Sequence, residues 1–176
     1  MPASPESLAA GRAYQQNLLA ALGGDDPAVA QAATPAILRE LIAEAGPDLR
    51  TRPEPHEWSA VELIGHMVDA ELASATRYRW ILAQDEPDLV PYDQDAWADR
   101  LHSTDEPLED LLPVFDALRA ANLRLWAGAS AADRARVGQH LERGPESYDL
   151  TFRLLAGHDR VHVAQARAGL ARIRAR

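Results

Sequence analysis

The stretch WSAVELIGHMVDAELASATRYRWILA, residues 58–83, predicts one long helix. Ser59 is suited to cap its N-terminus, and Glu62 follows three residues later, as in a capping box. Within the helix, a narrow polar stripe runs between two apolar flanks. The stripe holds Ser59, Glu62, His66, Asp69 and Arg77, and the flanks hold Val61, Ile64, Val68 and Leu72 on one side and Leu63 and Met67 on the other. Periodicity leaves open whether this stripe faces water or surrounds an internal polar site.

Helical periodicity broken by Pro and Gly continues on both sides of this stretch, and no alternating run bounded by hairpin signals predicts a strand. We expect a helix near residues 5–22 and a second from Thr34, as N-cap before Pro35, to Gly46. Two more are expected near 107–127 and 149–172. The Asp-rich connection 84–106 has the length of a crossover or lid. The predicted fold is all-α, a four-helix bundle with a long crossover connection.

Length, composition and net charge exclude several classes of protein and of site. At 176 residues with 47% hydrophobic and 26% charged residues, the chain fits one soluble globular domain, 1–176, with residues 1–33 as a helical extension packing on the bundle. The net charge of −9 disfavours nucleic acid and membrane surfaces as partners. Without a signal segment or a long apolar run, we expect a cytoplasmic protein. The absence of Cys excludes disulfides, thiolate zinc sites and cysteine nucleophiles.

The last helix carries two histidines one turn apart, His158 and His162. Its solvent face is marked by an arginine every seven residues, and both imidazoles lie about 160° from that face, on either side of it. Both therefore point into the bundle. This spacing favours a metal site over core histidines satisfied by hydrogen bonds, which stays open as the alternative. His66 is the best candidate for a third ligand. The arginines are Arg153, Arg160, Arg167 and Arg174.

The acids near these histidines suggest supporting roles. The segment is not the HExxH motif, because position 159 is Asp. Glu62 and Asp69 lie one turn either side of His66. Each is placed to orient a metal-ligating histidine by a hydrogen bond, or to accept a proton from a metal-bound water or thiol. Each is equally compatible with a solvated helix acid.

Several other side chains have two open interpretations. His140 either borders the site or is a solvated loop histidine, and Arg77 either binds an anionic substrate group or pairs with a nearby acid. His56 and His102 have no partner at ligand spacing.

The segments EWSAVELIGHMVDAE (57–71) and GHDRVHVAQ (157–165) resemble the DinB/YfiT-like superfamily, which pairs a WSxxExxxHxxD helix with a C-terminal HDxxHxxQ helix. The resemblance implies a four-helix bundle of up-down-down-up character, a homodimer, and a divalent metal held by His66, His158 and His162. The superfamily includes metal-dependent thiol transferases and isomerases that use bacillithiol, mycothiol or glutathione, beside members without known activity.

We therefore expect an enzyme that uses Zn or Ni, or else Fe or Mn, to transfer a low-molecular-weight thiol to a small electrophile. Since the chain has no Cys, the thiol would arrive as a cosubstrate. The alternatives are a metal-dependent hydrolase and, from another class, a non-catalytic, stress-related bundle that binds a metal or small molecule.

Overall fold

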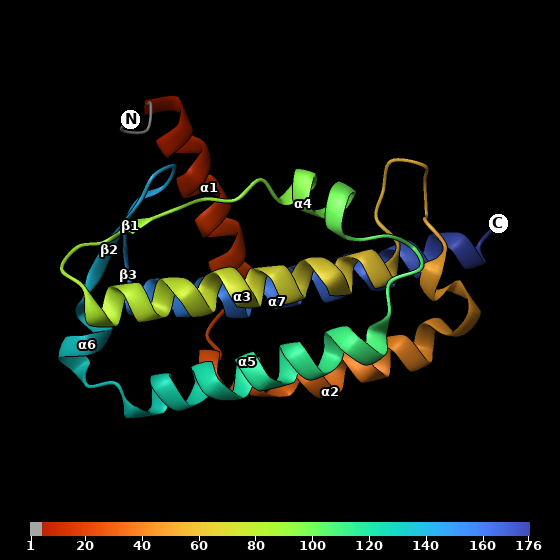
Figure 1. Ribbon diagram of the computed structural model, residues 1–176. Helices are drawn as coiled ribbons and strands as arrows, with labels where there is room; N and C mark the ends of the chain where they lie inside the picture. Colours follow the sequence, from red (N-terminus) through yellow and green to blue (C-terminus); the bar gives the residue numbers. More distant parts are fainter. Residues whose placement is uncertain (1–4) are drawn as a thin grey trace.

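Four long helices pack side by side in the computed structural model, which describes residues 5–176 (Figure 1). They are α2 (Pro27–Ala45), α3 (Ala60–Ala83), α5 (Leu108–Gly128) and α7 (Tyr148–Arg174). Each contacts two neighbours, because α2 and α3 both lie against α7, and α5 closes the bundle against α2 and α3. The predicted all-α four-helix bundle is confirmed.

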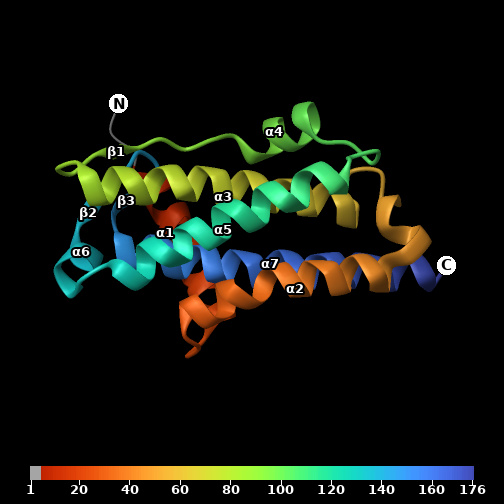
Figure 2. The same cartoon turned by 60° about the horizontal axis from the view of Figure 1, so that its bottom comes forward.

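The connection between α3 and α5 is a crossover. Residues 84–107 run back along α3, so that α3 and α5 point the same way while α2 and α7 point the other way (Figures 1 and 2). This segment contains β1 (Asp88–Leu89) and the short helix α4 (Gln94–Leu101), which packs on α3. The crossover thus places a second layer over the outer side of α3.

Helix α3 begins as its capping box predicts. The Ser59 amide donates to Glu62 Oε2 at 2.9 Å, and the Glu62 amide donates back to Ser59 Oγ. From Ala60 to Glu71 every side chain is buried, so the polar stripe surrounds an interior site and does not face water. Leu72 is an exception among the apolar flanks, because it is 47% exposed.

The predicted start of the second helix at Thr34 is wrong. Helix α2 begins at Pro27, and Asp26 caps it by accepting from the amides of residues 28 and 29. Pro35 therefore lies inside the helix, where it has no N–H for the carbonyl of Gln31. Arg119 Nη1 donates to that carbonyl instead, at 2.9 Å. The helix tolerates its proline because a buried arginine replaces the missing donor.

The prediction of no strands is also wrong. Within the described chain a small sheet forms in the order β1, β2 (Val137–His140), β3 (Gly144–Ser147), with β1 parallel to β2 and β2 antiparallel to β3. Strands of two and four residues are too short to show alternation. The helices α6 (Ala131–Ala135) and η1 (Gly46–Arg50), the latter a 3-10 helix, complete the connections.

Helix α1 (Pro5–Leu22) lies across α7 outside the bundle (Figure 1). The contact depends on Gly157, since a Cβ there would lie 2.0 Å from the carbonyl oxygen of Leu18. Residues 27–33 of the expected extension belong to α2, and residues 1–4 lie outside the described part of the chain. That the chain is a single domain stays a prediction.

The arginine stripe of α7 is exposed, as predicted. Three of its four members are paired with acids on the neighbouring segments: Arg160 with Asp25, Arg167 with Glu44 and Arg174 with Asp48. Over residues 5–176, none of the helices combines the length and the apolar character needed to cross a membrane.

Candidate metal centre

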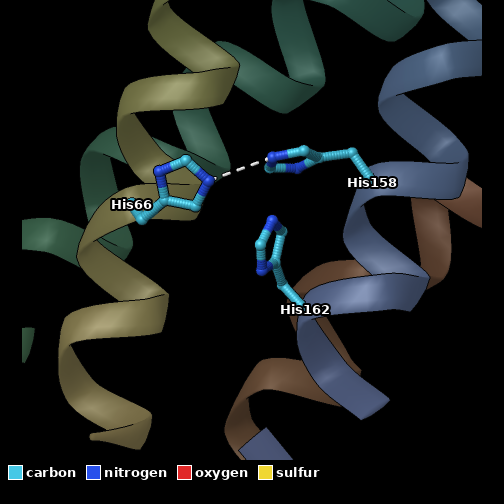
Figure 3. Close-up of side chains that lie close together, drawn as sticks. All are labelled: His66, His158 and His162. Atoms are coloured by element: carbon cyan, nitrogen blue, oxygen red, sulfur yellow. Dashed lines mark hydrogen bonds between the residues drawn. The ribbon is translucent and has the colours of Figure 1, made fainter. Parts of the chain in front are cut away.

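The three predicted histidines converge between α3 and α7 (Figure 3). Each of His66, His158 and His162 offers one ring nitrogen, and these atoms lie within 4.8 Å of one another. The closest pair is His66 Nε2 and His158 Nε2, which are 3.1 Å apart. Two turns of α7 and one of α3 thus bring together ligands separated by about half the chain.

This geometry fits a metal ion. With nitrogen–metal bonds of about 2.0–2.1 Å, two atoms 3.1 Å apart subtend an angle of roughly 100° at an ion. That angle suits four-coordinate to six-coordinate ions. His162 Nδ1 lies 2.9 Å from Gln165 Oε1, which leaves Nε2 as its free nitrogen. Gln165, for which no separate role was predicted, therefore orients the third ring.

Electrostatics keeps the imidazoles neutral. Burial, with a smaller contribution from neighbouring His162, lowers the pKa of His66 from 6.5 to about 3. Burial also holds the pKa of His158 well below its usual value and lowers that of His162. A ring that is neutral at pH 7 has a free lone pair, which a metal ligand requires.

A charged cluster lies directly behind this centre. Arg119 of α5, only 1% exposed, donates to Asp159 Oδ2 at 2.7 Å and pairs with Glu71 at 2.7 Å. Thr34 Oγ1 donates to the same oxygen of Asp159 at 2.8 Å. The cluster joins α2, α3, α5 and α7 beside His158. One feature of the sequence points to this cluster. Arg119 lies four residues after the buried Phe115, so the two side chains lie on the same, core-facing side of α5.

The two predicted acids have different surroundings. Glu62 is occupied, because it accepts from Ser59 and pairs through both oxygens with Arg52. Asp69 Oδ2 lies 2.7 Å from His102 Nε2, and this hydrogen bond raises the pKa of His102. Catalytic roles for Glu62 and Asp69 stay predictions.

His102 has partners that its sequence spacing did not reveal. Besides Asp69, it lies 3.3 Å from Glu106 and packs so closely on Gly65 that a Cβ there would be 2.6 Å from its Nδ1. The crossover brings His102 to α3, and such a long-range contact has no local signal.

A cavity of about 580 Å³ adjoins the centre at His158, which lines it. His140 also lines it and is only 2% exposed, so the solvated interpretation of His140 is wrong. Arg77 lines the same cavity at 7% exposure. Among the described residues it makes no ion pair; its Nη2 donates to the carbonyl of Val90 at 2.9 Å.

Together, the up-down-down-up bundle and its three inward histidines define a class of helical proteins with a candidate metal centre. A sequence model of the DinB superfamily matches residues 30–166, and the chain belongs to that superfamily. The resemblance noted from the two histidine motifs is thereby confirmed.

Relatives are named for metal-dependent chemistry. One from Oceanobacillus iheyensis is 25% identical over 131 residues, covering 74% of this chain and 76% of the relative. Another, from Bacillus mycoides, is 26% identical over 107 residues, and the match spans 61% of each chain. Both carry the name "Putative metal-dependent hydrolase".

A solved structure shares the fold. YfiT from Bacillus subtilis is described as "a probable metal-dependent hydrolase with an unusual four-helix bundle topology". It superposes with a TM-score of 0.72 over 97% of this chain and 89% of YfiT. At 18% identity, this likeness concerns the fold alone.

Proposed function

We propose that the protein is a metal-dependent hydrolase whose ion is held by His66, His158 and His162. The observation that carries the proposal is the convergence of three neutral imidazoles, two of them buried, beside a cavity. Three histidine ligands are typical of catalytic rather than structural zinc, because positions remain for substrate and solvent. The names of the relatives support the same reaction class.

A divalent ion at this place would supply Lewis acidity toward a coordinated water or thiol. Other side chains of the protein position the histidines. Gln165 orients His162, and the cluster of Arg119 and Asp159 fixes the α7 backbone at His158. Zn, Ni, Fe and Mn all accept imidazole ligands. Elemental analysis of the purified protein would identify the ion.

Of Glu62 and Asp69, Asp69 is the better placed to accept or donate a proton. It shares a 2.7 Å hydrogen bond with His102, and the positive charge of His102 contributes to lowering the pKa of His66. This coupling indicates that the Asp69–His102 pair lies within electrostatic reach of the centre. Glu62 is less suited, because Arg52 and Ser59 occupy its oxygens.

Thiol transfer is the second candidate. The cavity of about 580 Å³ is much larger than water requires and has the size of small-molecule sites. It therefore offers room for a low-molecular-weight thiol beside an electrophile.

The test compares nucleophiles on metal-loaded protein. Water, bacillithiol, mycothiol and glutathione are offered with the same panel of small esters and amides. We expect metal-dependent turnover with water, lost together with bound metal in His162→Ala. His56→Ala is the matched control, because His56 is exposed and away from ligand spacing. Turnover only with a thiol would replace hydrolysis by transfer. No turnover by loaded protein would leave a non-catalytic binding protein.

A further inference from the structure

The cavity beside His158 has walls that the metal site does not use. Its inner side is formed by α3 and α7, and it is covered by α1, the crossover and the turn between β2 and β3. Apolar side chains, among them Leu18, Leu154 and Leu155, line part of it. A cavity of about 580 Å³ with both apolar and polar walls is suited to a small organic molecule.

Arg77 is a buried charge in this wall that makes no ion pair with a described residue. Its guanidinium makes no ion pair within residues 5–176, although the side chain is only 7% exposed. Burial, followed by the neighbouring charge of Arg143, lowers the pKa of Arg77. Burying an unpaired charge is costly, and an anionic ligand would offset that cost.

The other charges of the cavity do not neutralise Arg77. Arg143 is paired through two nitrogens with the fully buried Glu146, so these two cancel. The acids that also line the cavity, Asp93 and Glu142, are both exposed to solvent. Water screens them, whereas Arg77 lies inside. The inner wall therefore carries a net positive charge.

His140 adds a neutral donor. Its Nδ1 accepts from the backbone amides of Glu142 and Arg143 at 3.2 and 3.3 Å. A nitrogen that accepts carries no hydrogen, so the hydrogen of the neutral ring is on Nε2. That nitrogen is buried and has no partner in the described part of the chain. Burial lowers the pKa of His140 to about 3, which keeps the ring in this form.

Two tyrosines complete the polar wall. Tyr14 of α1 and Tyr92 of the crossover line the cavity, and burial raises the pKa of both hydroxyls. Both therefore remain protonated and can donate. Arg77, His140 and these hydroxyls form a set that offers hydrogen bonds and positive charge, which is the complement of an anion.

We propose that the cavity is an anion subsite, in which Arg77 and the Nε2–H of His140 bind the carboxylate or phosphate of a small organic substrate. The apolar wall of Leu18, Leu154 and Leu155 takes the body of that molecule, and its reactive group lies toward His158. This inference rests on the proposed function, because it names the substrate class of the same site. Arginine is suited to this work, since its planar fork matches carboxylate and phosphate.

Calorimetric titration of the full chain tests the subsite. The probes are 4-phenylbutyrate, its neutral amide and phenyl phosphate, each titrated into metal-free and Zn-loaded protein. We expect an anion to bind at least roughly tenfold tighter than the amide in both forms. The ratio of carboxylate to phosphate affinity separates the two anionic groups. Equal affinity for amide and anions, or no binding of any probe, would overturn the proposal.

Variants assign the charge to Arg77. Arg77→Gln should abolish the preference for the anions, whereas Arg100→Gln, at an exposed arginine of α4, should leave it unchanged. If Arg77→Gln fails to fold, Ser74→Asp keeps the arginine and places a carboxylate three residues before it on the same wall. It should remove anion binding equally. An unchanged preference in either folded variant contradicts the subsite.

The two proposals fail separately. Metal-free protein that prefers the anions, followed by no metal-dependent turnover, would leave the subsite standing and remove the hydrolase. Metal-dependent turnover of neutral esters with no preference for anions would do the reverse.

Discussion

At the scale of single residues, the candidate centre depends on imidazoles that the fold keeps unprotonated. His66 and His158 are 1% and 6% exposed, and their ring nitrogens face one another rather than water. Protonating either would place a positive charge beside its neighbours in a buried site. The same property that prepares these rings for a metal makes the metal-free fold sensitive to acid.

The pH dependence of stability should show this. The folded-state pKa of His66 is about 3, below the unfolded value of 6.5, so between these values the unfolded chain binds more protons. Stability should therefore fall as pH falls from 6.5 toward 3, by a few kcal/mol, at about 1.4 kcal/mol for each unit of pKa difference. Urea unfolding of metal-free protein at pH 7 and pH 4 measures the loss.

His66→Gln is the comparison for this prediction, since it removes one such group and should reduce the loss between pH 7 and 4. His102 acts in the opposite sense. Its hydrogen bond with Asp69 raises its pKa, so its contribution is present below pH 6.5 and is lost as pH rises through the raised value. Equal pH profiles for wild type and His66→Gln would contradict the prediction.

Arg119 should be among the most costly side chains to remove. Arg119→Met would leave Glu71 and Asp159 as buried, unpaired carboxylates, and the Gln31 carbonyl without its donor. Breaking a buried pair in this way costs about 3–5 kcal/mol. Chemical denaturation would measure it.

The control for Arg119 is Arg39→Met, which breaks an exposed pair with Asp116 and should cost under about 1 kcal/mol. Similar losses in the two variants would show that the buried cluster has no special weight. Partial recovery in the double variant Arg119→Met, Glu71→Gln would support the charge argument.

At the scale of elements, the crossing of α1 over α7 depends on one glycine. Gly157→Ala would place a methyl group 2.0 Å from the backbone oxygen of Leu18, and backbone cannot rotate away as a side chain can. We expect a loss of about 1–3 kcal/mol and faster hydrogen exchange of the α1 amides. Gly128→Ala is the control, because a Cβ there meets nothing within 4 Å. An undisturbed α1 in Gly157→Ala would contradict the close contact.

Elements with local signals were predictable. The capping box at Ser59 and Glu62 located the start of α3, and the arginine repeat oriented α7 and so aimed His158 and His162 inward. The predicted start of α2 is wrong because it places Pro35 at the first residue of a helix. The sequence does not distinguish that position from one inside a helix, since the donor that replaces the missing N–H comes from the distant Arg119. The two-residue strand β1 had no periodicity to detect.

The candidate site also has a part that could be predicted from the sequence and a part that could not. The inward direction of His158 and His162 followed from the spacing on α7. His66 as the third ligand rested on the resemblance, because periodicity left open whether its polar stripe faces water. The partners of Arg77 and His102, and the position of His140 in the cavity wall, could not be predicted, because they depend on how the crossover and the β2–β3 turn fold back over α3. These are contacts between segments far apart in the chain, which a periodic pattern does not encode.

At the scale of the whole molecule, the resemblance to DinB/YfiT-like proteins predicts a homodimer. Sedimentation equilibrium or solution scattering should give twice the chain mass of 19.2 kDa at micromolar concentration. A monomeric mass across the concentration range would remove this prediction without affecting the metal centre, since all three histidines come from one chain.

The crossing of α1 over α7 makes the N-terminal helix part of the cavity wall. The family match begins at residue 30, whereas α1 ends at Leu22, and yet α1 contributes Tyr14 and Leu18 to the cavity beside His158. The three histidines lie within the residues that the family model matches, whereas Tyr14 and Leu18 of the cavity wall lie before them. Substitutions in α1 would therefore change the shape and polarity of this wall while leaving the three histidines in place.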